Sequence, residues 1–194
     1  MLLDFDILKV VSNDIKPEAG KVLISEPLLD DLYFKRSVVL LCESYNDSFL
    51  GLILNLKSDL FLHDVLDGFT KTNISLYLGG PVDPDVLYFI HSFNYIKNSY
   101  KIADGIFLNG DLEDVKQLVN SGIATDKNIK FFLGNSGWAP GQLREEIAYN
   151  SWLVGEMPYK HMFPGDSNLW LKSLDFVDSK YQVWKNFPTD PEYN

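Results

Sequence analysis

Residues 134–142 form the stretch of this sequence whose residue types best suit ligand binding. The apolar run 129–133 before it predicts a strand, and Pro140 suits the first turn of a helix predicted over 140–150. Backbone N–H groups at such a junction can hold an anion. The segment lacks the Lys-Ser/Thr pair of a P-loop, and Trp138 stands where a nucleophile elbow needs glycine. The alternative is structural, with glycines making a tight turn and Trp138 filling the core.

Two further candidate features are a glycine-rich run after a predicted strand and a histidine within an apolar run. The run Gly79-Gly80-Pro81 follows a predicted strand, and its bare backbone either makes an awkward turn or faces the same surface as Trp138. His91 lies inside the apolar run Y-F-I-H-S. It is either a hydrogen-bonded core histidine or a functional histidine beside the glycine turn.

Arg36 and Asn55 bracket two apolar runs that predict a hairpin. Depending on strand register, the two side chains lie at one rim or at opposite ends. Arg36 can bind a carboxylate of this chain or an external anion.

Other reactive residue types lack the neighbours that chemistry requires. Cys42 lies in an apolar run, where cysteine behaves as a small hydrophobe. The three histidines are far apart and have no metal-ligand spacing, so we expect no metal and no cofactor. Glu145 and Glu146 are adjacent on a predicted helix and therefore point in different directions, which argues against a paired-carboxylate site.

Strands outnumber helices in the predicted element order. Apolar runs and turn signals predict strands over 20–26, 36–42, 49–56, 74–78, 86–92, 99–107 and 129–133. Helical patterns cover 60–69, 111–121, 140–150 and 167–174, and residues 187–191 should be extended. In the helix over 111–121, Asp111 is the expected N-cap. The unbroken apolar character of the hairpin over 36–56 predicts that both of its faces are covered.

This pattern predicts an α+β fold with a largely antiparallel sheet. The chain has 194 residues, enough to bury about 70% of its unfolded surface in one core. No linker or repeat divides it, so we expect a single domain over residues 1–194.

The charge of the chain argues against two classes of partner. The formal net charge is -10, and no third of the chain is basic. Such a surface repels nucleic-acid phosphates and anionic lipid. One cysteine, no signal peptide and no apolar run of membrane-spanning length indicate a cytoplasmic protein without a membrane partner.

Five segments together resemble the YqgE/AlgH family in order and spacing. They are G-K-V-L-I-S-E-P (20–27), F-K-R-S-V-V-L-L (34–41), G-L-I-L-N (51–55), G-G-P-V (79–82) with His91 following, and G-N-S-G-W-A-P-G-Q-L (134–143) with Glu146 following. The C-terminal N-F-P-T-D-P resembles a subgroup of Bacteroidetes-like members. The resemblance implies a bacterial cytoplasmic protein with a bent sheet partly closed into a barrel and flanked by helices. It brings the label of transcriptional regulator and no settled catalytic activity.

The leading hypothesis is a non-enzymatic, regulatory binding module. Its partner would be a protein or a small anionic ligand, and any regulation would be indirect, because the acidic charge opposes contact with nucleic acid. The binding cleft would be built from nine residues: Arg36, Asn55, Gly79, Gly80, Pro81, His91, Gly137, Trp138 and Gln142. The alternative is a hydrolase-like enzyme in which His91 acts as general base in a cleft with residues 134–142. It requires His91 beside Ser, Asp or Glu in an open pocket.

Overall fold

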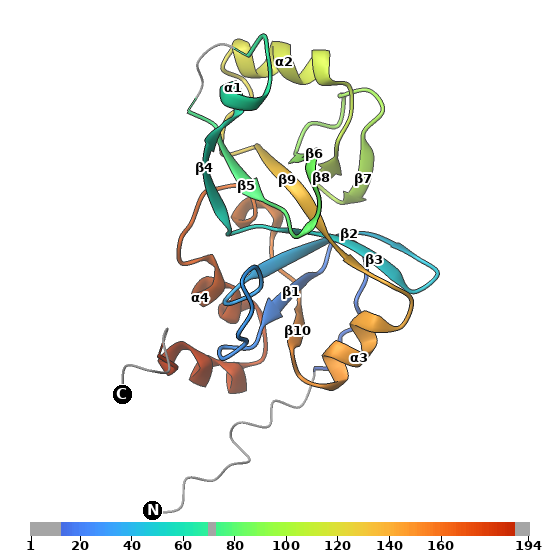
Figure 1. The fold of residues 1–194 in the computed structure, drawn as a ribbon, viewed down its shortest axis with the longest axis vertical. Coiled ribbons are helices and arrows are strands. Elements are labelled where there is room, and N and C mark those ends of the chain that lie inside the picture. Colours follow the sequence, from blue (N-terminus) through green and yellow to red (C-terminus); the bar gives the residue numbers. More distant parts are fainter. Residues whose placement is uncertain (1–12, 70–72, 189–194) are drawn as a thin grey trace, which may run out of the picture.

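The computed structural model describes residues 13–69 and 73–188, which form a ten-stranded sheet with helices on its faces (Figure 1). The strands are β1 (Val22–Ser25), β2 (Val38–Tyr45), β3 (Ser48–Ile53), β4 (Lys57–Phe61), β5 (Ser75–Leu78), β6 (Val82–His91), β7 (Tyr100–Ala103), β8 (Ile106–Leu108), β9 (Ile129–Trp138) and β10 (Trp152–Gly155). The α-helices are α1 (Leu62–Val65), α2 (Leu112–Asn120), α3 (Gln142–Ala148) and α4 (Leu169–Ser173). Shorter 3₁₀ turns are η2 (Tyr159–His161), η3 (Leu174–Phe176) and η4 (Ser179–Asn186).

The sheet follows the order β10-β1-β2-β3-β9-β6-β8-β7, with β4 and β5 as a side branch. The described strand pairs are antiparallel, apart from the parallel pair of β5 with β9. The predicted α+β class with a largely antiparallel sheet is therefore confirmed.

The expected partial barrel is wrong. The path of paired strands begins at β10 and ends at β7, and these two edges do not pair in the described part of the chain. The physical reason lies in β9, whose first part pairs with β5 and β6 and whose last part pairs with β3. The two halves of the sheet are thus covered by different helices and do not curl around one interior (Figure 1).

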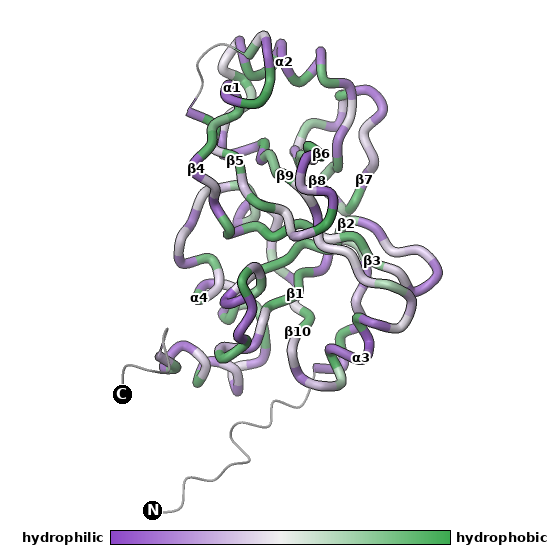
Figure 2. Tube along the Cα trace, viewed as in Figure 1, coloured by the Kyte–Doolittle hydropathy of each residue, from purple (hydrophilic) through white to green (hydrophobic). Residues whose placement is uncertain are grey.

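Both faces of the β1–β3 region are buried, as the unbroken apolar runs predict. Val38 and Leu40 pack on one face with the C-terminal helices, in a cluster that includes Trp170 and Trp184. Val39 and Leu41 pack on the other face with Trp138 and Trp152. Figure 2 shows hydrophobic residues concentrated along β1 and β2, whereas α2 and α3 alternate hydrophobic and hydrophilic residues.

Strand β9 contradicts the predicted turn over residues 134–139. The strand continues through this segment to Trp138. Gly134 has φ +70°, and the register of β9 on β6 shifts between Leu87 and Val82 at the same place. A glycine in a strand with positive φ is typical of a bulge that bends the strand. The bend directs residues 136–138 away from β6 and onto β3.

Several other elements differ in length from their predictions. Helix α3 begins at Gln142 and not at Pro140, with Gly141 in the left-handed region at its N-cap. The predicted helix over 60–69 is one short turn, because residues 57–61 pair with β5 as strand β4. The predicted strand over 99–107 is a hairpin of β7 and β8 that turns at Gly105, φ +79°. Of the predicted extended segment, residues 189–191 lie outside the described part of the chain.

The prediction for helix α2 is confirmed in detail. The Asp111 side chain accepts hydrogen bonds from the backbone N–H groups of Glu113 (3.0 Å) and Asp114 (3.2 Å). These bonds satisfy two donors that have no partner within the helix. Val115 and Val119 are buried against Phe131 of β9, so the apolar face of α2 covers the β5–β9 part of the sheet.

Candidate functional site

The structure brings four of the nine predicted site residues to one cleft. Pro81, Gly137, Trp138 and Gln142 line a cavity of about 410 Å³ between the end of β9, the start of α3 and the loop before β2. Six further residues complete its lining: Leu29, Asp31, Phe34, Glu146, Ser151 and Trp152. We call these ten residues the aromatic cleft. Its volume lies within the range of ligand pockets in proteins.

Three aromatic rings from distant parts of the sequence form the floor of the aromatic cleft. Phe34 and Trp152 pack edge to face at 5.4 Å between ring centroids, and Trp138 and Trp152 do so at 6.1 Å. Such contacts fix the orientation of the rings. Trp138 also packs in the core between the sheet and α3, so the structural interpretation of this residue is correct as well.

Glu146 of α3 links the aromatic floor to the rim of the cleft. Its Oε2 atom accepts hydrogen bonds from the indole Nε1 of Trp138 and of Trp152, both at 2.8 Å. Its Oε1 atom accepts from Nε2 of Gln142 at 2.9 Å. Gln142 in turn accepts from the backbone N–H of Ala139 at 3.1 Å. Three neutral donors therefore hold the carboxylate in place without neutralising its charge.

The aromatic cleft is acidic. The described residues that line it include the carboxylates of Asp31 and Glu146 and no lysine or arginine. Arg144, on the same helix as Glu146, instead pairs with Asp47 at 2.7 Å. An acidic lining disfavours an anion, which argues against the anion site that the sequence suggested at this helix start.

Gly79 and Gly80 do not line the aromatic cleft but pack beneath it. A Cβ atom on Gly79 would lie 2.2 Å from the carbonyl oxygen of Gly134, and one on Gly80 would lie 2.4 Å from that of Asn135. The hydroxyl of Ser136 donates to the Gly79 carbonyl at 2.9 Å. These glycines therefore allow two backbones to approach closely, a role that differs from both the awkward turn and the shared surface that the sequence suggested.

Arg36 and Asn55 lie together, but away from the aromatic cleft. Asn55 accepts from the backbone N–H of Val38 and donates to the carbonyl of Arg36, both at 2.9 Å. The Arg36 guanidinium donates to the carbonyls of Phe187 and Pro188, both at 2.7 Å, and lies 4.6 Å from the Trp170 ring centroid. This arginine thus fastens the C-terminal segment, and it binds carbonyl groups where the sequence suggested a carboxylate or an anion.

His91 lies at the opposite end of β9 from Trp138. It pairs with Ile129, nine residues before Trp138, which is a separation of roughly 25 to 30 Å along a strand. The side chain is fully buried, stacks on Phe107, and has a pKa lowered by burial. Among the described residues, His91 is thus closed off from solvent, whereas the alternative enzyme hypothesis requires it in an open pocket.

The hydrogen bonds of His91 also assign its proton. Nδ1 accepts from the backbone N–H of Phe93 at 3.2 Å, so Nε2 carries the hydrogen and donates to the carbonyl of Asn109 at 2.8 Å. The Ser99 hydroxyl lies 3.1 Å from Nε2 and donates to the carbonyl of Ile96. Because Nε2 is already protonated, His91 does not serve Ser99 as a base in this arrangement.

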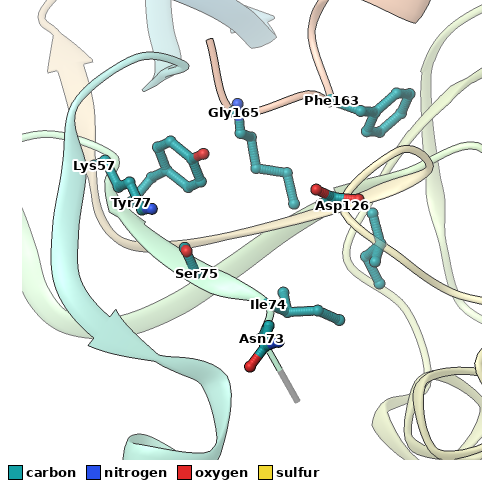
Figure 3. A pocket seen from close by; sticks show the side chains of 10 residues that line it. Lys57, Asn73, Ile74, Ser75, Tyr77, Asp126, Phe163 and Gly165 are labelled. Atoms are coloured by element: carbon teal, nitrogen blue, oxygen red, sulfur yellow. The ribbon is translucent and has the colours of Figure 1, made fainter. Parts of the chain in front are cut away.

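A second, smaller cavity of about 180 Å³ was missed from the sequence. It lies beside β5, and its lining includes Lys57, Ser75, Tyr77, Asp126 and Lys130. Figure 3 shows Tyr77 and Asp126 reaching into this cavity from opposite walls. We call it the Lys130 pocket.

Lys130 of β9 is a buried cation held by backbone oxygens. Its Nζ atom donates to the carbonyls of Leu54 (2.8 Å), Met162 (3.1 Å) and Pro164 (3.4 Å), and it lies 4.1 Å from the centroid of the Tyr77 ring. Burial lowers the pKa of Lys130 to about 7. With all three hydrogens directed at carbonyls, the ammonium joins β9 to the end of β3 and to the loop after η2. A lysine within the apolar run I-K-F-F-L was the sequence signal for this role.

The sequence of this chain is similar to that of known proteins over nearly its whole length. The family model described as AlgH-like matches residues 22–182. The chain belongs to the AlgH-like family. Among its relatives is a UPF0301 protein of Bacteroides thetaiotaomicron, 40% identical with 100% of both chains covered. Another is a UPF0301 protein of Parabacteroides distasonis, 40% identical with 97% of this chain and 98% of the relative covered. The resemblance noted in the sequence is thereby confirmed.

Two solved structures share the fold of this AlgH-like chain. A protein from Corynebacterium diphtheriae superposes with a TM-score of 0.75 at 24% identity, covering 96% of this chain and 100% of that one. The AlgH protein from Pseudomonas aeruginosa superposes with a TM-score of 0.70 at 21% identity, covering 92% and 98%. Among the described residues, no helix combines the length and apolar character needed to span a bilayer.

Proposed function

We propose that this AlgH-like protein is a non-enzymatic binding module with a regulatory role, and that it holds a partner protein in the aromatic cleft. The observation that carries the proposal is the meeting of Pro81, Gly137, Trp138 and Gln142 with two further aromatic residues in one cavity. These positions come from separate segments of the chain. Aromatic walls with a few fixed polar groups are typical of binding sites.

The organisation of the polar groups supports recognition. The Glu146 carboxylate is held by two indoles and Gln142, so its position is set before any partner arrives. A rigid polar group costs little conformational entropy when a partner binds. Gly137 is exposed and lines the cleft.

The charge of the chain supports a protein partner over a nucleic acid. A net charge of -10 and an acidic cleft repel phosphate groups. We therefore propose that any regulatory role, as the label of the family suggests, is indirect and acts through a partner protein. We place this action in the cytoplasm, where the single buried thiol of Cys42 would stay reduced.

The test removes one aromatic wall of the cleft. Phe34 is partly exposed and its ring packs against Trp138 and Trp152, so Phe34→Ala should weaken the binding of the partner. Tyr149→Ala removes an exposed ring just after α3, outside the cleft lining, and is the matched control. Urea unfolding of both variants checks that they fold. Proteins captured from cells of the source bacterium by the wild type and the control, but not by Phe34→Ala, are then purified and titrated directly. A purified partner that binds folded Phe34→Ala as tightly as the wild type contradicts the proposal.

A further inference from the structure

We propose that the group seated in the aromatic cleft is the cationic side chain of an arginine or lysine, presented by a basic segment of the partner protein. The inference rests on the proposed function, because it names the chemistry of the partner at the same site. It also reverses the sign of the small ligand that the sequence suggested.

The first argument is an acidic group without a counter-charge. Glu146 is half-buried, and its three hydrogen-bond donors are two indoles and an amide, which are neutral. No cation among the described residues lies within ion-pair distance of Glu146 or Asp31. A half-buried carboxylate is better stabilised by a cation than by neutral donors alone, so a free guanidinium or ammonium is drawn to it.

The second argument is that two arginines close to the cleft in the sequence, Arg144 and Arg36, are held elsewhere. Arg144, two residues before Glu146, is bound to Asp47 of the β2–β3 hairpin at 2.7 Å. Arg36 is bound to carbonyls of the C-terminal segment. Neither arginine supplies a counter-ion to the cleft, and no lysine or arginine among the described residues lines it.

The third argument is the apolar lining around the carboxylates. Leu29, Phe34 and Pro81 line the cleft and are not fully buried. Arginine and lysine have long apolar stems that pack on such surfaces while the charged head reaches a polar group. Aromatic faces add attraction for a cation. The two carboxylates of the lining, Asp31 and Glu146, can then hold the head.

The partner chemistry is tested with short peptides that differ at one position. The probes are the acetylated, amidated peptides Ala-Leu-X-Leu-Ala, where X is arginine, lysine, glutamine or glutamate, and the protein is the full chain labelled with ¹⁵N. The indole N–H resonances of Trp138 and Trp152 report on the cleft. Those of Trp170 in α4 and Trp184 in η4, which are buried in another cluster, are internal controls. We expect the arginine and lysine peptides to shift the first two resonances saturably. Their affinity should exceed that of the glutamine peptide at least fivefold, and the glutamate peptide should not bind.

Charge variants of the protein test whether the peptide binds the Glu146 carboxylate of the cleft or the acidic surface in general. Glu146→Gln keeps an acceptor for the indoles and removes the charge, so the arginine peptide should bind at least fivefold more weakly. Glu145→Gln removes the same charge from the neighbouring, exposed position that does not line the cleft, and it should leave the affinity within twofold.

Two results overturn the inference, and they differ in what they say of the proposed function. If the glutamine peptide shifts the Trp138 and Trp152 resonances as strongly as the arginine peptide, the cleft is a binding site but not a cation site. If no peptide shifts these resonances, or Glu145→Gln weakens binding as much as Glu146→Gln, the cationic occupant is wrong. The proposed function is then still decided by the Phe34→Ala experiment, which does not depend on the charge of the partner.

Discussion

Trp138 and Trp152, fourteen positions apart on two different strands, donate their indole N–H groups to the same oxygen atom of Glu146. One carboxylate thus sets the orientation of both rings. It also fastens α3 to β9 and to β10, because each partner comes from a different element.

Replacement of Glu146 by alanine should destabilise the protein. It leaves two largely buried indole donors without their acceptor, and an unsatisfied buried donor costs about 1 to 3 kcal/mol. We expect the free energy of unfolding in urea to fall by about 2 kcal/mol. Glu145→Ala, at the exposed neighbouring position, is the control and should change it by less than about 0.5 kcal/mol. Equal effects of the two substitutions would show that the indole bonds contribute nothing.

Replacement of Gly79 by alanine should be far more costly than the same change at Gly137. The new Cβ atom at position 79 would lie 2.2 Å from the backbone oxygen of Gly134, so one backbone must move. We expect a loss of about 3 kcal/mol in the free energy of unfolding, the upper range for overpacking. At Gly137 the nearest atom is 3.7 Å away, and the change should stay within about 0.5 kcal/mol. Thermal and urea unfolding of both variants measure the difference, and similar values would refute the close approach of β9 to Gly79.

Lys130 should make stability depend on pH above neutrality. Its pKa is lowered to about 7 in the folded protein, whereas an unfolded lysine titrates near 10.4. Between these values the unfolded chain binds a proton that the folded chain has released, so the free energy of unfolding rises with pH. The stability of the wild type minus that of Lys130→Met should therefore increase from pH 7 to pH 9, by up to about 1.4 kcal/mol per pH unit. Subtracting the stability of Lys130→Met removes the contribution of the other titrating groups. A stability difference that stays constant or falls as the pH rises contradicts the prediction.

Most strands were predictable because a buried strand has a continuous run of apolar residues in the sequence. The run over 36–42 is nearly unbroken in its apolar character. Strand β2 is indeed buried on both faces, with Val38 packed on one side and Val39 on the other. The open sheet was not predictable, since it depends on how β9 changes partners. At the Gly134 bulge, the carbonyls of Gly80 and Val82 lie within 3 Å of where its Cβ would be, and these residues are 54 and 52 positions earlier in the sequence. A glycine-rich strand and a glycine-rich turn look alike without those contacts.

The candidate site was predictable only in its local part. Gly137, Trp138 and Gln142 are neighbours in the sequence, so their shared position follows from one segment. Phe34, Trp152 and Asp31 join them through the fold alone. Glu146 was judged by its relation to Glu145, as a carboxylate pair, whereas its true partners are indole groups. His91 was assigned to the same surface because the sequence does not show that its strand runs to the far end of β9.

Strand β9 contributes residues to each of the three hydrophobic clusters in the described part of the chain. Phe131 lies in the cluster beneath α2, Phe132 in the one beneath the C-terminal helices, and Trp138 in the one beneath α3. No cluster can separate from the others while this strand stays in place, and loss of the strand opens all of them at once. The amide hydrogens of β9 should therefore exchange with solvent only when the whole molecule opens, and the protein should unfold as one cooperative unit.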